Sequence, residues 1–272
     1  EDKEFFKTPR YFFNVFENNS DSLALYYSFD NPISKNNTIA DESGNEYFGR
    51  LGNKSKGEAP VWTFEGHDGG AYEFESDYID SGNILNDKVK NGFTISAWVK
   101  NPRMDYYSGI ITKGTSFQLL APYNRYAFNV KTLNGSQTII AYNIENNIWH
   151  RLDGVYTGSE ICLYFDSGFV GCKPLNGSVE EQNSSFIIGK RSGGYSFNGL
   201  IDEVKIYSEP LEPDVILTNM NIEKKSNGFS SVELEFLYEY NEADLNNLEI
   251  TTRNVGEDSI KISLFELSIE KI

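Results

Sequence analysis

Residues 93–100 read Phe93-Thr94-Ile95-Ser96-Ala97-Trp98-Val99-Lys100, and this stretch decides the fold class. Its odd positions are all apolar, and they alternate with Thr, Ser, Trp and Lys. Successive side chains of a β-strand point to opposite faces, so a period of two indicates a strand. The pattern predicts a strand that buries one of its faces.

Similar short segments recur along the chain, separated by turns rich in Gly, Asn and Asp. No stretch carries the sustained apolar stripe of a helix, and regularly spaced short strands favour a sandwich. The sequence therefore predicts an all-β, antiparallel β-sandwich. The other predicted strands span residues 23–29, 71–74, 109–112, 116–119, 126–132, 138–142, 149–156, 161–165, 169–172, 185–188 and 200–207.

The charge balance of the chain limits its partners. Its 272 residues include 24 Lys and Arg against 40 Asp and Glu, for a net charge of −16. Nucleic-acid binding depends on basic residues that neutralise phosphates, so an acidic excess argues against it, and against an anionic membrane surface. No apolar run approaches the ~18 residues that a membrane-spanning segment needs. We expect neither a nucleic-acid partner nor a direct membrane span.

The two ends differ from this pattern. Residues 1–22 form an aromatic N-terminal arm, and residues 212–272 are typical of a second, smaller β-rich unit. Within that unit, the apolar alternation slips register between Leu264 and Phe265, which predicts a β-bulge. We expect the arm to pack on its own chain, against the C-terminal unit. The alternative is self-association, in which the arm pairs with a strand of a neighbouring copy.

Six segments, in this order, resemble the laminin-G-like, concanavalin A-type jelly-roll domains. The resemblance covers residues 23–211 and implies an antiparallel jelly-roll β-sandwich there. This family includes adhesion modules, carbohydrate-binding modules and domains attached to enzymes, so the fold alone does not give the function. The segments are the strand at 23–30, the loop Asp41-Glu42-Ser43-Gly44-Asn45 with Gly49, the strand at 93–100, the pair at 149–152 and 163–168, and the strand at 199–207.

Asp202 lies in the predicted strand 200–207, at alternate positions that are otherwise apolar. An unpaired carboxylate there is costly, so it needs a cation or several backbone N–H donors. Calcium takes about six to eight oxygen ligands. The resemblance implies a structural Ca²⁺ held by Asp41, Asn45 and Asp202. The alternative is that Asp202 only accepts hydrogen bonds from backbone amides of residues 41–49.

Cys162 and Cys172 flank the predicted hairpin turn Asp166-Ser167-Gly168 symmetrically. Directly opposed residues of a hairpin bring their Cα atoms to ~4.5 Å, which is within the range of a disulfide. We favour a disulfide over two free thiols. A disulfide would place the chain outside a reducing cytosol.

The chain contains six Asn-x-Ser/Thr sequences, where its composition alone predicts about four. All six lie before residue 186 and near predicted turns, which is compatible with glycans on the surface of a secreted protein. The candidate glycosylation sites are Asn18, Asn36, Asn53, Asn134, Asn176 and Asn183.

Sugar binding needs exposed aromatic faces together with polar groups. Tyr106, Tyr107, Tyr123 and Tyr195 fall in predicted loops and are candidate ligand-binding residues. The alternative is that they only pack over strand ends.

Glycosidases of related folds use two carboxylates across the scissile bond. No such motif occurs within residues 23–211, and the adjacent Asp202 and Glu203 are expected to point to opposite faces. We therefore expect no catalytic residues. His150 follows Trp149 on a predicted strand and is expected to be structural, whereas His67 lies in a glycine-rich loop and is expected to be solvated.

The sequence thus predicts an extracellular or cell-surface protein that binds or adheres without catalysis, with a glycan or a surface protein as its partner. The first alternative is a structural subunit of a surface filament or coat, assembled through its terminal segments. The second alternative is a secreted glycoside-active enzyme.

Overall fold

Two units emerge from the contacts within the chain, one comprising residues 22–220 and the other residues 1–21 with 221–272. The structure, a computed structural model, describes residues 10–15, 22–32, 38–52, 59–102, 107–166, 168–191, 193, 195–213, 215–216, 231–235 and 262–268.

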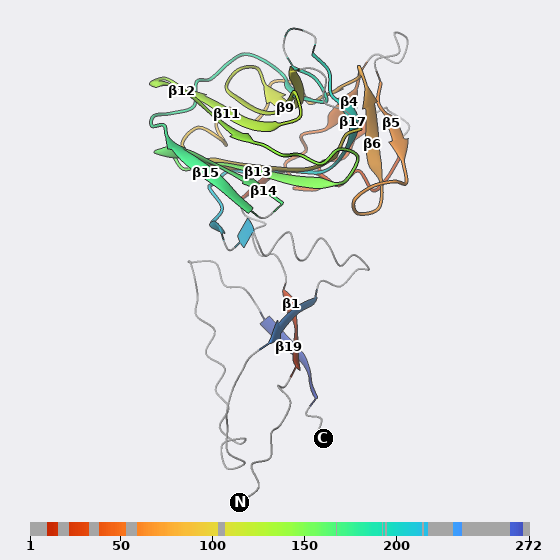
Figure 1. Cartoon of the computed structure of the whole chain (residues 1–272). Coiled ribbons are helices and arrows are strands. Elements are labelled where there is room, and N and C mark those ends of the chain that lie inside the picture. Colours follow the sequence, from red (N-terminus) through yellow and green to blue (C-terminus); the bar gives the residue numbers. More distant parts are fainter. Residues whose placement is uncertain are drawn as a thin grey trace, which may run out of the picture. The chain divides into compact units, whose positions relative to one another are not determined.

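Residues 22–220 form a sandwich of two antiparallel eight-stranded sheets, which Figure 1 shows as two layers. We call one layer the front sheet, and its strand order is β12-β11-β10-β9-β16-β7-β4-β3. We call the other layer the back sheet, and its strand order is β15-β14-β13-β8-β17-β6-β5, with β2 also paired to β17. The front strands are β3 (Thr38–Ile39), β4 (Gly49–Leu51), β7 (Ile79–Asp80), β9 (Tyr107–Lys113), β10 (Phe117–Pro122), β11 (Tyr126–Thr132), β12 (Gly135–Ala141) and β16 (Phe186–Ile188). The back strands are β2 (Leu23–Tyr27), β5 (Val61–Thr63), β6 (Ala71–Glu75), β8 (Phe93–Lys100), β13 (His150–Tyr156), β14 (Glu160–Phe165), β15 (Gly168–Pro174) and β17 (Asn198–Tyr207).

The fold is the predicted all-β sandwich, and each predicted strand of residues 23–207 falls on an observed one. Four short strands, β3, β4, β5 and β7, are additional. They span only two or three residues each, which is too short to show a period of two.

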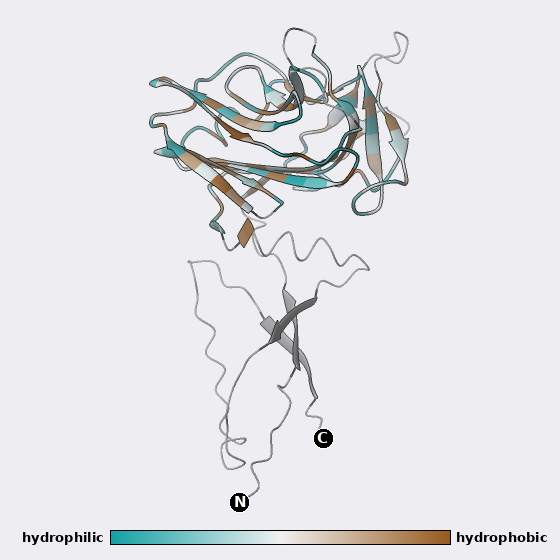
Figure 2. Cartoon of the chain, in the orientation of Figure 1, coloured by the Kyte–Doolittle hydropathy of each residue, from teal (hydrophilic) through white to brown (hydrophobic). Residues whose placement is uncertain are grey.

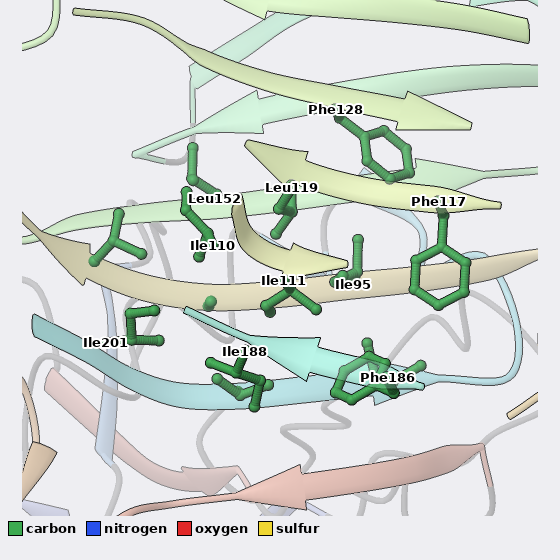
Figure 3. Close-up of a cluster of buried hydrophobic side chains, with 14 of the residues drawn as sticks. Ile95, Ile110, Ile111, Phe117, Leu119, Phe128, Leu152, Phe186, Ile188 and Ile201 are labelled. Atoms are coloured by element: carbon green, nitrogen blue, oxygen red, sulfur yellow. The ribbon is translucent and has the colours of Figure 1, made fainter. Parts of the chain in front are cut away.

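The core lies between the sheets and is filled by aliphatic and aromatic side chains from both layers (Figure 3). Ile111, Leu119 and Phe128 point inward from the front sheet, and Ile95 and Leu152 from the back sheet. Each is fully buried, which contributes about 1.5–3 kcal/mol per large side chain. Along the strands, hydrophilic and hydrophobic residues alternate (Figure 2).

Strand β8 buries both of its faces, so the prediction of one buried face was wrong. Thr94, Ser96 and Trp98 point away from the core, yet each is at most 2% exposed. The reason is topological, because β8 lies between β13 and β17 in the middle of the back sheet, whose outward face is itself covered.

Strand β17 contains a bulge that the period-two pattern did not reveal. The pairing with β8 shifts between Asp202 and Lys205, and Glu203 adopts a φ of 51°. Ile201 faces the core before the bulge and Val204 faces it afterwards. Asp202 pairs with Trp98 and therefore lies on the outward face, not on the face of Val204 as the sequence indicated.

The β14–β15 hairpin carries the predicted disulfide. Cys162 pairs directly with Cys172, their Cα atoms are 4.1 Å apart, and the two sulfurs are bonded. The turn lies between Phe165 and Gly168, where the sequence placed it.

The second unit is a three-stranded antiparallel sheet of β1 (Arg10–Val15), β18 (Ser231–Glu235) and β19 (Ile262–Ser268). Strand β1 lies in the centre and pairs with both C-terminal strands of its own chain. The β1–β19 register skips one residue between Leu264 and Leu267, which is the predicted bulge. The other residues of the arm and of segment 212–272 lie outside the described residues, apart from 22, 212–213 and 215–216.

Candidate functional site

One row of residues crosses the outward face of the front sheet. Each member of the row pairs directly with the next member on the neighbouring strand. The residues next to these members in the sequence form a parallel row of apolar side chains in the core. Because side chains alternate between faces, this register turns a polar face outward. The outward row is Thr38, Arg50, Asp80, Ile187, Thr112, Gln118, Asn129 and Thr138.

A groove of about 730 Å³ lies over β3, β4 and β7 at one end of this row. It combines three aromatic residues with hydrogen-bonding side chains of the row, and we call it the front groove. Phe48 is 50% exposed, so its ring is available for contact. The residues that define the front groove are Thr38, Tyr47, Phe48, Arg50, Tyr78 and Asp80.

Asp41 shapes the wall of the front groove. Its Oδ1 accepts hydrogen bonds from the backbone N–H of Tyr26 and of Ser43, each at 3.0 Å, and its Oδ2 accepts one from the N–H of Tyr47. Asn45 assists, because its Nδ2 donates to the carbonyl oxygen of Leu23 at 3.1 Å. The loop that leads to Phe48 is thereby tied to strand β2.

The floor is also fixed from the core side. The Tyr27 hydroxyl donates to the carbonyl oxygen of Tyr47 and lies 2.8 Å from Oγ of Ser81. On the opposite side, Oδ1 of Asp80 accepts from the N–H of Gly82 at 2.8 Å. The groove therefore rests on a hydrogen-bonded frame.

A second cavity of about 400 Å³ adjoins the front groove and shares Tyr78 with it. Two basic side chains line it, and each lies over an aromatic ring. The Lys190 Nζ is 4.9 Å from the ring centre of Tyr78, and the Arg191 guanidinium carbon is 4.6 Å from that of Tyr107. We call this cavity the cation pocket, defined by Tyr78, Thr112, Ser184, Ile187, Lys190 and Arg191.

The loop that carries these cations is held tightly on β9. The Thr112 hydroxyl donates to the carbonyl oxygen of Lys190 at 3.0 Å, and the N–H of Arg191 donates to the carbonyl oxygen of Tyr195 at 2.9 Å. Gly109 permits this approach, because a Cβ there would lie 2.7 Å from the Arg191 nitrogen. Both cations therefore stand on a fixed base.

Two of the four predicted tyrosines lie beside this pocket. Arg191 connects Tyr107, through its ring, and Tyr195, through its backbone. Tyr123 follows Pro122, which pairs with Tyr107, and is exposed. Tyr106 lies outside the described residues. Tyr107 and Tyr195 thus border the cation pocket without lining it.

The predicted metal ligands serve different loops. Asp202 is fully buried, and its Oδ2 accepts from the N–H of His67 and of Asp68, at 2.8 and 3.1 Å. Burial, and then the charge of Glu203, raises the pKa of Asp202 to about 9, although three backbone donors oppose this shift. The donors to Asp202 therefore lie at residues 67, 68 and 203, and the expectation that they belong to residues 41–49 was wrong. Asp41 and Asn45 lie in that other loop and bond to it and to strand β2.

Both acids of the Asp202–Glu203 pair lie on the outward side of the back sheet. Glu203 forms an ion pair with Lys205 at 3.0 Å and accepts a hydrogen bond from the Tyr26 hydroxyl at 2.9 Å. The expectation that the two side chains point to opposite faces was wrong, because the bulge redirects Glu203. Neither acid lines the front groove.

The two histidines have different environments. His150 is structural as expected, with Nδ1 2.6 Å from Oδ2 of Asp166 and Nε2 2.7 Å from the carbonyl oxygen of Glu145. His67 is not a solvated residue, because its ring stacks on Trp98 with a centroid distance of 3.5 Å. The backbone bonds of its loop to Asp202 hold it there.

Three of the six candidate glycosylation sites lie among the residues that the structure describes. Asn134 and Asn176 are exposed and hydrogen-bond each other through their amides at 2.9 Å. Asn183 is exposed and bonded to Asn83. Asn18, Asn36 and Asn53 lie outside the described residues. Glycosylation stays a prediction.

A family model of the concanavalin A-like lectin/glucanases superfamily matches residues 68–217, more than half of the chain. The chain belongs to this superfamily. The resemblance found in the sequence is thereby confirmed. No curated protein matches the sequence.

Several solved structures have a similar fold. The binding domain of Paraclostridial Mosquitocidal Protein 1 is similar at a TM-score of 0.61 and 16% identity, covering 75% of this chain and 52% of that one. This chain therefore spans about half the length of that domain. Domain 4 of the extracellular arabinanase AbnA from Geobacillus stearothermophilus, in complex with arabinotriose, gives 0.54 and 19%, covering 76% and 98%. The ligand-binding domain of botulinum neurotoxin serotype D, in complex with N-acetylneuraminic acid, gives 0.56 and 15%, covering 74% and 51%.

At these identities the comparisons show the fold.

Within the described residues, no helix is long and apolar enough to span a membrane. Sequence reasoning missed Arg50, Tyr78 and Lys190, which form the groove and the pocket. The sequence did hold a signal for Lys190 and Arg191, because the run Gly189-Lys190-Arg191 concentrates positive charge in an acidic chain.

Proposed function

We propose that this superfamily member is an extracellular, non-catalytic protein that binds a carbohydrate chain in the front groove. The observation that carries the proposal is the groove itself, where Tyr47, Phe48 and Tyr78 lie beside Arg50 and Asp80. Ligand sites combine apolar and aromatic walls with a few placed polar groups. The C–H faces of a sugar pack on aromatic rings, and its hydroxyls bond to the polar side chains.

The frame of the groove supports binding without large rearrangement. Asp41 fixes the loop before Phe48, and Tyr27 fixes Tyr47 from below. A site that is already formed loses less conformational entropy when a ligand binds. The solved relatives with this fold include one in complex with arabinotriose and one with N-acetylneuraminic acid, which further supports a glycan as the ligand.

Two observations favour binding over catalysis. The buried acid with a strongly raised pKa, Asp202, lies on the outward side of the back sheet beneath the loop of His67. The acids that line the groove are Glu46 and Asp80, and an oxygen of Asp80 is already used by the Gly82 N–H. An extracellular location is supported by the Cys162–Cys172 disulfide.

The test is an array of oligosaccharides followed by calorimetry on the ligands that bind. Phe48→Ala and Arg50→Ala should each weaken the affinity about tenfold, which corresponds to about 1.4 kcal/mol. Phe169→Ala is the matched control, because Phe169 is an exposed ring on the back sheet, in strand β15. It should leave the affinity unchanged.

Two results would overturn the proposal: no oligosaccharide binds, or the groove variants bind as well as Phe169→Ala does. The same incubations, followed by mass spectrometry of the sugars, test the enzymatic alternative. We expect the oligosaccharides to be recovered intact, and cleavage products would favour a glycoside-active enzyme.

A further inference from the structure

The cation pocket has a charge opposite to that of the whole chain. The protein carries a net charge of −16, yet among the described residues the lining of this pocket includes Lys190 and Arg191 and no carboxylate. Within the described part of the chain, neither cation forms an ion pair. Lys190 instead lies over the Tyr78 ring, and Arg191 lies over the Tyr107 ring. A contact with an aromatic ring does not neutralise a cation, so both positive charges remain available to an anion.

We propose that the cation pocket binds an anionic group of the glycan, a carboxylate or a sulfate ester, so that the protein recognises acidic sugars. This inference rests on the proposed function and names its substrate class. Tyr78 separates the two cavities and belongs to both, so a sugar chain in the front groove extends naturally past Tyr78 to Lys190 and Arg191.

The chemistry of the pocket suits an oxyanion. The planar guanidinium of Arg191 presents paired N–H donors that match a carboxylate or a sulfate, and Lys190 adds a compact charge. Ser184 lines the same cavity, and its buried hydroxyl has no hydrogen-bond partner among the described residues. A buried polar group without a partner is costly, so a rotation of the Ser184 side chain that lets an oxyanion accept from its hydroxyl removes that cost.

The backbone that carries the two cations is held in place before any ligand arrives. Thr112 holds the carbonyl of Lys190, and the close approach at Gly109 sets the loop against β9. Charged groups held in place bind an ion without first paying for their own ordering. The pocket therefore selects for charge at one defined point along the sugar chain.

The experiment compares binding of three matched oligosaccharides, one neutral, one ending in N-acetylneuraminic acid and one sulfated. The wild-type protein should bind at least one acidic ligand about tenfold more tightly than the neutral one. The double variant Lys190→Gln/Arg191→Gln should lose this preference and keep the affinity for the neutral ligand. The two acidic ligands distinguish a carboxylate from a sulfate as the recognised group.

Two control variants separate charge from structure. Arg125→Gln removes a cation that lies 5.2 Å from the ring of Tyr142, outside the pocket, and should leave the preference intact. Arg191→Lys keeps the charge without the planar fork and should retain part of the preference. Melting temperatures of all variants show whether the loop remains folded.

The failures of the two proposals are distinguishable. Equal affinity for neutral and acidic ligands overturns this inference and leaves the groove as a glycan site. If no oligosaccharide binds, sodium sulfate and free N-acetylneuraminic acid are titrated and followed by NMR. Shifts at Lys190 and Arg191 that the double variant abolishes support an anion pocket, and their absence overturns it.

Discussion

The outward faces of the two sheets use charged residues differently. On the front sheet, a polar row leads through an open groove, and Arg50 and Asp80 line the cavity. On the back sheet, charged residues are buried and paired with one another, as in Arg151–Asp153, where both side chains are 1% exposed. The groove leaves the exposed Arg50 side chain open to a ligand, although Thr112, Gln118 and Asn129 of the same row bond within the protein. The back sheet satisfies its buried charged residues internally.

The difference shows that a polar residue on an outward strand position has two meanings. Asp202, Glu203 and Lys205 look like site residues by type, but their partners are protein groups and they are buried. Arg50 and Tyr78 look unremarkable in the sequence, but they line cavities. What separates the two faces is whether the protein itself satisfies the charge.

The largest expected effect comes from breaking the buried pair. Asp153→Ala removes the carboxylate from the Arg151 guanidinium, which it meets at 3.0 Å. Removing one partner of a buried ion pair leaves a desolvated charge, so we expect a loss of about 3–5 kcal/mol in the free energy of unfolding. Urea denaturation followed by fluorescence measures it.

The front sheet supplies the control. Lys131 and Glu180 form an ion pair of 2.7 Å with side chains that are 41% and 30% exposed. Glu180→Ala should cost less than about 1 kcal/mol, because solvent screens such a pair. Similar losses for the two variants would contradict the contrast between the faces.

The disulfide is the next largest contribution, and it lies on the back sheet. The bridge closes a short loop between Cys162 and Cys172, so its loss in Cys162→Ala/Cys172→Ala should cost about 2–3 kcal/mol in the chain-entropy model. Denaturation measures the loss, and intact mass after alkylation without reduction measures the bridge. Two thiols that alkylate in the unreduced, denatured protein would contradict it.

Much of the sandwich was predictable from the sequence, because long strands show their period. Strand β11 begins and ends where the alternation of residues 126–132 places it. The bulge at Glu203 was not predictable, since a single residue in the left-handed region leaves no mark on the apolar pattern and yet reverses the face of every later side chain.

The candidate site was less predictable than the fold. Tyrosines in predicted loops were the candidates, and two of them, Tyr107 and Tyr195, border the cation pocket. Tyr107 is not in a loop, however, but is the half-buried first residue of strand β9. The groove itself depends on β3, β4 and β7, which are too short to recognise and which come together only through pairing across distant parts of the chain. Residue types could suggest binding, but only the register brings Arg50 beside Tyr78.

A smaller effect is expected at the loop that frames the groove. Asp41→Ala removes the acceptor for the N–H groups of Tyr26, Ser43 and Tyr47 and should cost about 1.5–3 kcal/mol, since the acceptor is charged. Asp87→Ala, at an exposed residue, is the control and should cost little. Calorimetric unfolding measures both.

The same variant tests the calcium prediction. If Asp41, Asn45 and Asp202 bind Ca²⁺, a chelator should lower the melting temperature of the wild type and leave that of Asp41→Ala unchanged, because a ligand of the native state stabilises it by mass action. A wild-type melting curve that excess chelator does not move would exclude the site and leave the backbone hydrogen bonds as the role of Asp41.

The smallest expected effect is the pH dependence that His150 gives to the back sheet. Burial lowers the pKa of His150, but the hydrogen bond to Asp166 and the carbonyl oxygen of Glu145 outweigh it, so the pKa is raised in the folded state. The protonated ring donates to both oxygens, whereas a neutral ring turns one lone pair toward an oxygen.

Because the folded pKa of His150 lies above the unfolded value, this stabilisation is fully present below the unfolded pKa and is lost as pH rises through the folded pKa. Its size should be on the order of 1 kcal/mol, since Asp166 is partly exposed and solvent screens the pair. His150→Gln and Asp166→Asn should each flatten the fall in melting temperature as the pH rises above the unfolded pKa of histidine. A wild-type slope that persists in both variants would show that another group titrates there.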